Sequence, residues 1–313
     1  MSVADFKFTG SHRSSLKVAL HRAQQAPVIL DQRPSILHHE SPSDFDSLEK
    51  LFFACMQTAD DQCALSCLEH LAHRFGSSNE RVSALRSLYD EAVAQGQPNL
   101  ERCLETYDDI LSQNPVNLPI LKRRIALLRS LSRYTDAISS LVQLLEATPT
   151  DAEAWCELAD LYQSQGLSPQ AIFSLEEALL IVPHAWNVHA RLGEILYVYA
   201  NSLDNEGMRR QLRYSIQHFC RSIELCEDYL RGFYGLALAT SRILVEETPE
   251  TTSRHPKHGQ ESFRRLQALA TKKLSAILTK QYSLAPHLRD YEENELAAVK
   301  ELLSSSANDH LSD

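Results

Sequence analysis

The chain has 313 residues and a formal net charge of −10, from 31 Lys and Arg against 41 Asp and Glu. This balance argues against nucleic acid as the main partner, because binding to a phosphate backbone needs a basic surface. Only 9 glycines and an aromatic content of 7%, with many Leu, Ala, Glu and Arg residues, favour helices over strands.

Neither a secretory signal nor a membrane span is recognisable. The start, M-S-V-A-D-F-K-F-T-G, has no apolar run behind a basic region. Apolar runs such as Leu179–Val182 are far shorter than the roughly 20 residues that a bilayer-spanning helix needs. We therefore expect a soluble chain of the cytosol or nucleus. Its seven cysteines are interpreted as small apolar residues rather than as a disulfide framework.

Residues 1–43 carry the least pattern. Pro27, Pro34 and Pro42 interrupt them every seven or eight residues, which predicts at most a short helix that begins near Leu16 and ends before Pro27. We interpret the segment as a proline-broken amino-terminal arm. It is expected to lie against the rest of the chain or a partner, or to be disordered.

From residue 44 onward, apolar residues recur as pairs of stripes at helical spacing. The pairs are expected over 44–76, 83–115 and 119–149, each with a turn between its two helices. The prolines that follow successive pairs, Pro115, Pro149 and Pro183, lie 34 residues apart. A fixed internal period of this length predicts a solenoid of helical hairpins.

The clearest pair runs from Asp151 to Pro183. Its first helix carries a stripe of Trp, Leu, Ala and Tyr, and its second helix carries two small residues around a leucine. A proline that cannot continue the helix closes it. This arrangement is typical of the tetratricopeptide repeat. The repeat positions are Trp155, Leu158, Ala159, Tyr162, Ala171, Leu175, Ala178 and Pro183.

After Pro183 the 34-residue period is no longer kept. The next closing helix, marked by Ser215, Phe219 and Ser222, arrives ten residues late. We assign the extra residues to a polar insertion in the hairpin turn, around 201–210, because insertions in repeats usually fall in loops. A further opening helix with Phe233 follows.

The predicted solenoid therefore covers residues 44–245, and the fold class is all-α. A polar stretch with prolines predicts a linker over 246–260. An apolar stripe over 261–303 predicts two capping helices, the second beginning near His287, followed by a polar tail over 304–313. The basic side of the first capping helix could meet anionic lipid or an acidic partner, although a solvated face is the simpler interpretation.

Candidate catalytic and metal sites are weak. Cys63, Cys67, His70 and His73 share one helix, but they span ~15 Å, so a single ion cannot reach all four. The sequence has no Gly-rich phosphate loop and no G-x-S-x-G, H-E-x-x-H or C-x-x-C motif. We therefore expect no enzyme activity, no cofactor, no metal and no small-molecule substrate.

The opening helices of a tetratricopeptide stack line an inner groove, on the side turned away from the Trp–Leu–Tyr stripe. Mixed charge and two aromatic side chains on that side suit an extended polypeptide better than a polyanion. A groove filled by the chain's own arm or tail is the alternative. The predicted groove residues are Lys122, Arg129, Asp160, Gln163, Glu194, Tyr197 and Tyr229.

Three segments resemble a known family over residues 84–240. They are N-P-V-N-L-P-I-L-K-R-R-I-A-L-L-R, D-A-E-A-W-C-E-L-A-D-L-Y and A-I-F-S-L-E-E-A-L-L-I-V-P-H, and they are similar to the second-subunit family of the endoplasmic reticulum membrane protein complex. The resemblance implies a non-catalytic cytosolic scaffold. Its partners would be other protein subunits of the membrane-bound complex, an insertase for transmembrane segments, and it would lie peripherally on the cytoplasmic face of the membrane.

A competing function is that of a free cytosolic tetratricopeptide adaptor or co-chaperone that binds a peptide in its groove. Adaptors of the carboxylate-clamp kind grip an acidic peptide terminus with Lys, Asn and Arg. The matching positions here hold Lys122, Ala126, Glu157, Asn187 and Arg191. Ala126 replaces one asparagine, and Glu157 places a negative charge that would repel the peptide carboxylate.

Overall fold

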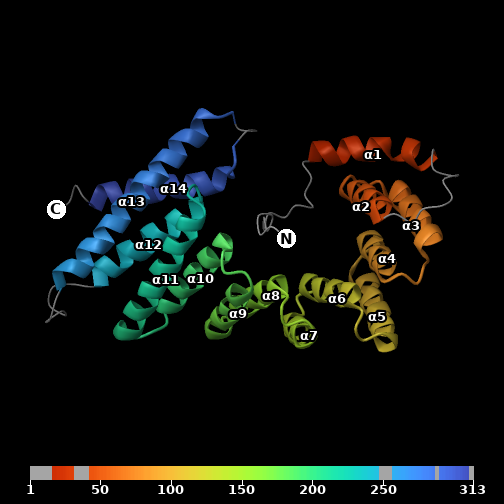
Figure 1. Cartoon of the computed structure of the whole chain (residues 1–313), viewed down its shortest axis with the longest axis horizontal. Coiled ribbons are helices and arrows are strands. Elements are labelled where there is room, and N and C mark those ends of the chain that lie inside the picture. Colours follow the sequence, from red (N-terminus) through yellow and green to blue (C-terminus); the bar gives the residue numbers. More distant parts are fainter. Residues whose placement is uncertain (1–15, 32–41, 247–255, 286–288, 310–313) are drawn as a thin grey trace. The chain divides into compact units, whose positions relative to one another are not determined.

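The computed structural model describes residues 16–31, 42–246, 256–285 and 289–309 (Figure 1). The chain divides into two compact units, residues 1–149 and 150–313, which we describe separately. Every regular element in the described residues is an α-helix, and from α2 to α12 short turns join successive helices. The prediction of an all-α solenoid of helical hairpins is confirmed.

Unit 1 consists of one leading helix and three hairpins. Helix α1 packs on α2 and α3, and the hairpins α2/α3, α4/α5 and α6/α7 follow in order. The helices are α1 (Leu16–Asp31), α2 (Pro42–Gln57), α3 (Asp61–Phe75), α4 (Glu80–Val93), α5 (Gln97–Gln113), α6 (Leu118–Ser130) and α7 (Tyr134–Ala147).

Helix α1 contradicts the expectation of a helix that ends before Pro27. It continues through Pro27 to Asp31, although proline removes one backbone hydrogen bond and costs about 3 kcal/mol in a helix interior. Its buried face, which includes Ala23 and Leu30, packs into the apolar core of α2 and α3, and this packing offsets the local cost. Residues 1–15 and 32–41 of the predicted arm lie outside the described residues.

Unit 2 begins with the clearest repeat and ends in longer helices. Consecutive helices pack on one another from α8 to α14. They are α8 (Ala152–Ser164), α9 (Ser168–Ile181), α10 (Trp186–Ala200), α11 (Asn205–Leu225), α12 (Leu230–Glu246), α13 (Pro256–Ser283) and α14 (Glu293–Asp309).

Five of the eight repeat positions lie in the core of the first hairpin of unit 2. Leu158, Ala159, Ala171, Leu175 and Ala178 are all buried. The two alanines of α9 leave room for close approach of its neighbours. The indole ring of Trp155 meets Phe173 edge to face, with ring centroids 6.1 Å apart, while Pro183 follows the end of α9.

The expected polar loop over 201–210 is wrong. Only residues 201–204 form the turn, and the rest of the insertion lengthens α11 to 21 residues. The carboxylate of Asp204 accepts a hydrogen bond from the Gly207 backbone N–H at 3.1 Å, which starts the helix early. Met208 then extends the buried stripe of α11 by one further turn.

The carboxy-terminal boundaries also differ from the prediction. Helix α13 begins at Pro256, inside the expected linker, while 247–255 lie outside the described residues. Helix α14 begins at Glu293 rather than near His287 and includes residues 304–309 of the expected tail. Both helices cover the core of unit 2, α13 on α12 and α14 on α13, as capping helices should.

Candidate functional site

The predicted groove residues belong to both units. Lys122 and Arg129 are exposed on α6 of unit 1, two helical turns apart and therefore on one side of that helix. The other five residues belong to unit 2, so the two sets are described separately.

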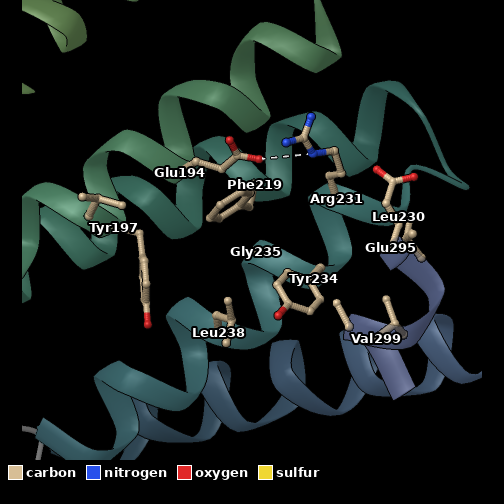
Figure 2. Close-up of a pocket in the computed structure, with 12 residues that line it drawn as sticks. Glu194, Tyr197, Phe219, Leu230, Arg231, Tyr234, Gly235, Leu238, Glu295 and Val299 are labelled. Carbon is tan, nitrogen blue, oxygen red and sulfur yellow. Dashed lines mark ion pairs between the residues drawn. The ribbon is translucent and has the colours of Figure 1, made fainter. Parts of the chain in front are cut away.

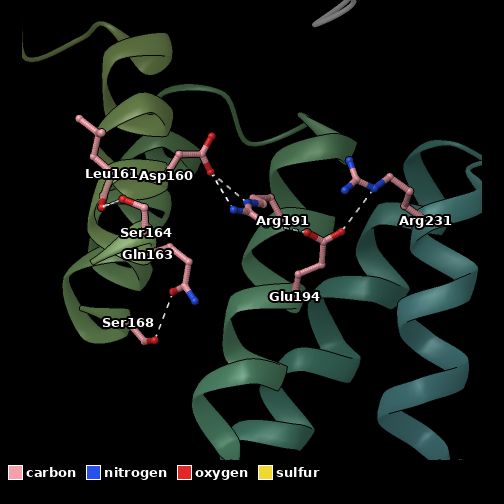
Figure 3. A network of polar contacts seen from close by, with 8 residues as sticks. All are labelled: Asp160, Leu161, Gln163, Ser164, Ser168, Arg191, Glu194 and Arg231. Atoms are coloured by element: carbon pink, nitrogen blue, oxygen red, sulfur yellow. Dashed lines mark hydrogen bonds and ion pairs between the residues drawn. The ribbon is translucent and has the colours of Figure 1, made fainter. Parts of the chain in front are cut away.

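A row of alternating charges joins the opening helices α8, α10 and α12 (Figure 3). The guanidinium of Arg191 on α10 donates to Asp160 Oδ1 on α8 at 2.9 and 3.1 Å, and to Glu194 Oε2 at 3.0 Å. On α12, Arg231 Nε lies 3.6 Å from Glu194 Oε1. We name these four residues, Asp160, Arg191, Glu194 and Arg231, the charge ladder.

The charged side chains of the ladder pair with one another. Burial alone would lower the pKa of Arg191, but the neighbouring carboxylates of Glu194 and Asp160 raise it overall, so this guanidinium stays charged. Because the side chains remain partly exposed, each pair contributes only about 0–1 kcal/mol to stability. The ladder therefore fixes the orientation of side chains on this face more than it stabilises the fold.

Gln163 lies next to the ladder and is used within its own hairpin. Its Oε1 accepts a hydrogen bond from the Ser168 hydroxyl at 3.2 Å, across the turn between α8 and α9 (Figure 3). The amide group is therefore oriented before any partner arrives.

An open apolar pocket adjoins the ladder at Glu194 and Arg231 (Figure 2). It lies among α10, α11, α12 and α14 and has a volume of about 350 Å³. This is within the range of natural ligand sites and is large enough for one or two bulky side chains. The other lining residues are Tyr197, Val198, Phe219, Leu230, Tyr234, Gly235, Leu238, Glu295, Ala298 and Val299.

Phe219 sits where α10, α11 and α12 meet and forms part of the pocket lining. Its side chain is 1% exposed. Two glycines make room for the ring: a Cβ atom on Gly193 would lie 3.0 Å from it, and a Cβ atom on Gly235 would lie 2.1 Å from it. The close approach of α10 and α12 to the ring thus depends on the absence of side chains at both positions.

Tyr291 fixes the wall that α14 contributes. Its hydroxyl donates to the Asp228 carbonyl at 2.6 Å and accepts from the Leu230 backbone N–H at 3.3 Å. Asp228 lies in the turn before α12 and Leu230 is the first residue of that helix, so the segment that leads into α14 is tied to the same edge of the pocket. Sequence periodicity gave no indication of this contact.

Tyr229 occupies the turn before α12 and does not line the pocket. Its ring meets Trp186 edge to face, with centroids 4.5 Å apart, and burial is the main cause that raises its pKa to about 12. On α12, Arg231 occupies the position equivalent to Glu194 on α10, and Tyr234 occupies the position equivalent to Tyr197. The two residues of each pair are 37 residues apart, whereas the repeat period is 34.

Among the described residues, no group of three or more His, Cys, Asp or Glu side chains is placed to hold a metal ion. None of the described helices combines the length and the apolarity that crossing a bilayer requires.

Comparisons with known proteins gave consistent results. A family model described as the EMC2 TPR-like repeat domain matches residues 68–202. The chain is 31% identical over 282 residues to TPR repeat protein oca3 of Schizosaccharomyces pombe, covering 87% of this chain and 96% of that protein. It is 29% identical over 257 residues to ER membrane protein complex subunit 2-A of Xenopus laevis, covering 82% and 79%. Identity to ER membrane protein complex subunit 2 of Saccharomyces cerevisiae is 25% over 199 residues, covering 60% and 66%.

Proposed function

This chain belongs to the family of ER membrane protein complex subunit 2, and from that membership we propose that it is a non-catalytic scaffold subunit of such a complex. It lies peripherally on the cytoplasmic face of the membrane and binds other protein subunits. By doing so it holds together the cytosolic parts of an insertase for transmembrane segments.

The pocket of unit 2 is the observation that supports the binding of other protein subunits. Apolar pockets that are open to solvent and rimmed by polar groups are typical of sites that bind other molecules. Tyr197, Tyr234 and Leu238 offer aromatic and aliphatic surface to an apolar side chain of a partner. The neighbouring charge ladder supplies a polar rim that would fix the register of the bound segment.

The charge ladder supports a scaffold over a carboxylate-clamp adaptor. Arg191, which would have to bind the carboxylate of a peptide terminus, already donates to Asp160 and Glu194. An incoming carboxylate would have to displace both. Together with Glu157 at a clamp position, this arrangement disfavours the recognition of acidic peptide ends.

Purification from detergent extracts tests the proposal. We expect a tagged chain to bring down membrane proteins in stoichiometric amounts. The variant Leu238→Lys places a charge in the pocket and should lower their recovery several-fold, because an unpaired charge is costly in a desolvated interface. Leu65→Lys, at an exposed leucine of α3 in unit 1, is the matched control and should behave as wild type.

Two results would count against the scaffold. One is recovery of the tagged chain from the soluble fraction alone, without membrane proteins, which would favour a free cytosolic adaptor. The other is equal recovery of partners by wild type and a folded Leu238→Lys variant, which would remove the pocket from the interface. Melting curves of both variants establish that they are folded.

A further inference from the structure

One segment has a charge opposite to that of the chain as a whole. The chain carries 41 acidic against 31 basic side chains, yet residues 262–289 contain six Lys or Arg and no Asp or Glu. Most of this segment is α13, which packs against α12 through a buried stripe that includes Ala270, Leu274 and Ile277. The basic residues are therefore confined to the rest of the helix surface.

The side of α13 that faces away from this buried stripe carries four cations. We name Arg264, Arg265, Lys272 and Lys280 the α13 basic face, and all four are exposed. They extend over about 24 Å of the helix axis at about 1.5 Å per residue. At about 100° per residue, Arg265 and Lys272 lie close together around the axis, and Arg264 and Lys280 lie about 80° to either side of Lys272. Leu269 projects between them and is 44% exposed.

Intramolecular pairing neutralises this face only in part. Arg265 Nε lies 3.1 Å from Glu261 Oε1, and Lys280 Nζ lies 3.4 Å from Asp228 Oδ2. Both pairs are well exposed and contribute little. Within the described residues, no acidic side chain forms an ion pair with Arg264 or Lys272. The face thus keeps an uncompensated positive charge.

We propose that the α13 basic face docks on an anionic lipid surface. A planar layer of negative headgroups can meet Arg265 and Lys272 at the centre of this exposed face, and the long side chains of Arg264 and Lys280 can reach it from the flanks. Each Lys or Arg near such a surface contributes about 1 kcal/mol. Leu269, set among the cations, can enter the headgroup region. The excess of acidic side chains elsewhere is repelled by the same surface, so the chain docks with α13 foremost.

This inference goes beyond the scaffold function and does not depend on it. It concerns a direct contact between this chain and lipid, which the purified full-length chain should make without other subunits. Failure of vesicle binding would leave the capture of membrane proteins unaffected, and loss of that capture would leave vesicle binding unaffected.

Vesicle flotation tests the inference. Vesicles of phosphatidylcholine alone should not bind the chain, whereas vesicles with about 30 mol% phosphatidylserine should bind it at low ionic strength. The variant Arg264→Gln, Arg265→Gln, Lys272→Gln should bind the anionic vesicles at least about tenfold more weakly. Its matched control carries the same change of charge at exposed residues of unit 1: Lys50→Gln, Arg86→Gln, Arg102→Gln. The control should bind as wild type.

Several results would overturn the proposal. They are equal binding of wild type to neutral and anionic vesicles, no binding to either, and equal losses in the two triple variants. Binding of polyglutamate by a chain that ignores anionic vesicles would identify an acidic protein segment as the partner instead. Salt provides a test that needs no variant: wild-type binding must weaken as ionic strength rises from about 0.05 M to about 0.5 M, because screening acts on exposed charges.

Discussion

Gly235 on α12 lies directly against the ring of Phe219 on α11, so closely that a Cβ atom at position 235 would be 2.1 Å from the ring. The side chain of Phe219 is 1% exposed, so a group added at position 235 meets the ring rather than solvent. The contact between these two residues sets how near α12 can come to α11, and it therefore shapes the pocket beside them.

Gly235→Ala should destabilise unit 2 by about 1–3 kcal/mol, because the added methyl group would clash with the buried Phe219 ring. Alanine is a better helix former than glycine by about 1 kcal/mol, so helix propensity alone would make the variant more stable. A decrease in the free energy of unfolding would therefore be due to the clash. Gly193→Ala, whose Cβ would lie 3.0 Å from the same ring, should cost less. Denaturant unfolding measures both, and an equal or reversed order would contradict the geometry.

Ala171→Leu should also destabilise the chain, by about 1–3 kcal/mol. Ala171 is fully buried where α9 approaches its neighbours, and a leucine there would force the helices apart. Ala268→Leu, on the exposed side of α13, is the control and should leave the unfolding midpoint nearly unchanged. A midpoint that does not move in the Ala171 variant would refute the packing role given to that position.

The double variant Lys122→Glu, Arg129→Glu should weaken the capture of partner proteins without unfolding the chain. Both residues are exposed on α6, and substitutions at such positions usually change stability by less than about 0.5 kcal/mol. Co-purification measures capture, and circular dichroism measures the fold. Full capture by a folded variant would exclude this side of α6 from the interface.

Acid should weaken the contact between α10 and α11. The rings of His189 and His218 stack with centroids 5.4 Å apart. Burial first, and then the charge of His189, lower the pKa of His218 to about 4, from the usual 6.5. Because the unfolded chain then binds this proton more readily than the folded chain, the stability present above pH 6.5 is lost as the pH falls towards 4.

Unfolding by urea at pH 7 and pH 5 measures this loss. We expect the wild type to lose about 1–2 kcal/mol from His218 between these values, and the variant His218→Asn to lose correspondingly less. His184 and Arg221 lie close enough to add repulsion when His189 is protonated, so part of the acid sensitivity should persist in the variant. Identical pH slopes in both proteins would show that His218 does not titrate in this range.

The sequence predicted the architecture well where apolar spacing and the repeat period agree. The hairpins from α2 to α9 match the expected pairs, because each depends on a local stripe closed by glycine or proline, but α2, α4 and α6 begin one to three residues earlier than expected. Pro27 misled the prediction because its local cost is offset by packing against α2 and α3, which spacing along the chain cannot show. The loop expected around 201–210 failed for a similar reason, since Asp204 and Met208 favour a longer helix.

The candidate site was predicted only in part. Asp160, Glu194 and Tyr197 were found because they follow the 34-residue period. Arg231 and Tyr234 were missed because the lengthened α11 shifts their equivalent positions by three residues. The contribution of α14 to the pocket depends on Tyr291, whose partners lie about sixty residues earlier in the chain.

The extra length of α11 has a further consequence for how the hairpins succeed one another. Helix α9 has 14 residues and α11 has 21, so α11 extends roughly 10 Å beyond what a repeat-sized neighbour would cover. Helix α12 reaches that surplus, because the Arg242 guanidinium donates to Met208 Sδ at 3.9 Å. Phe263 and Leu266 of α13 line one hollow with Ile216 and Cys220 of α11. The insertion thus makes the closing helix of the α10/α11 hairpin longer than that of the α8/α9 hairpin. The hairpins of unit 2 are therefore not of uniform size, and α11 marks the change.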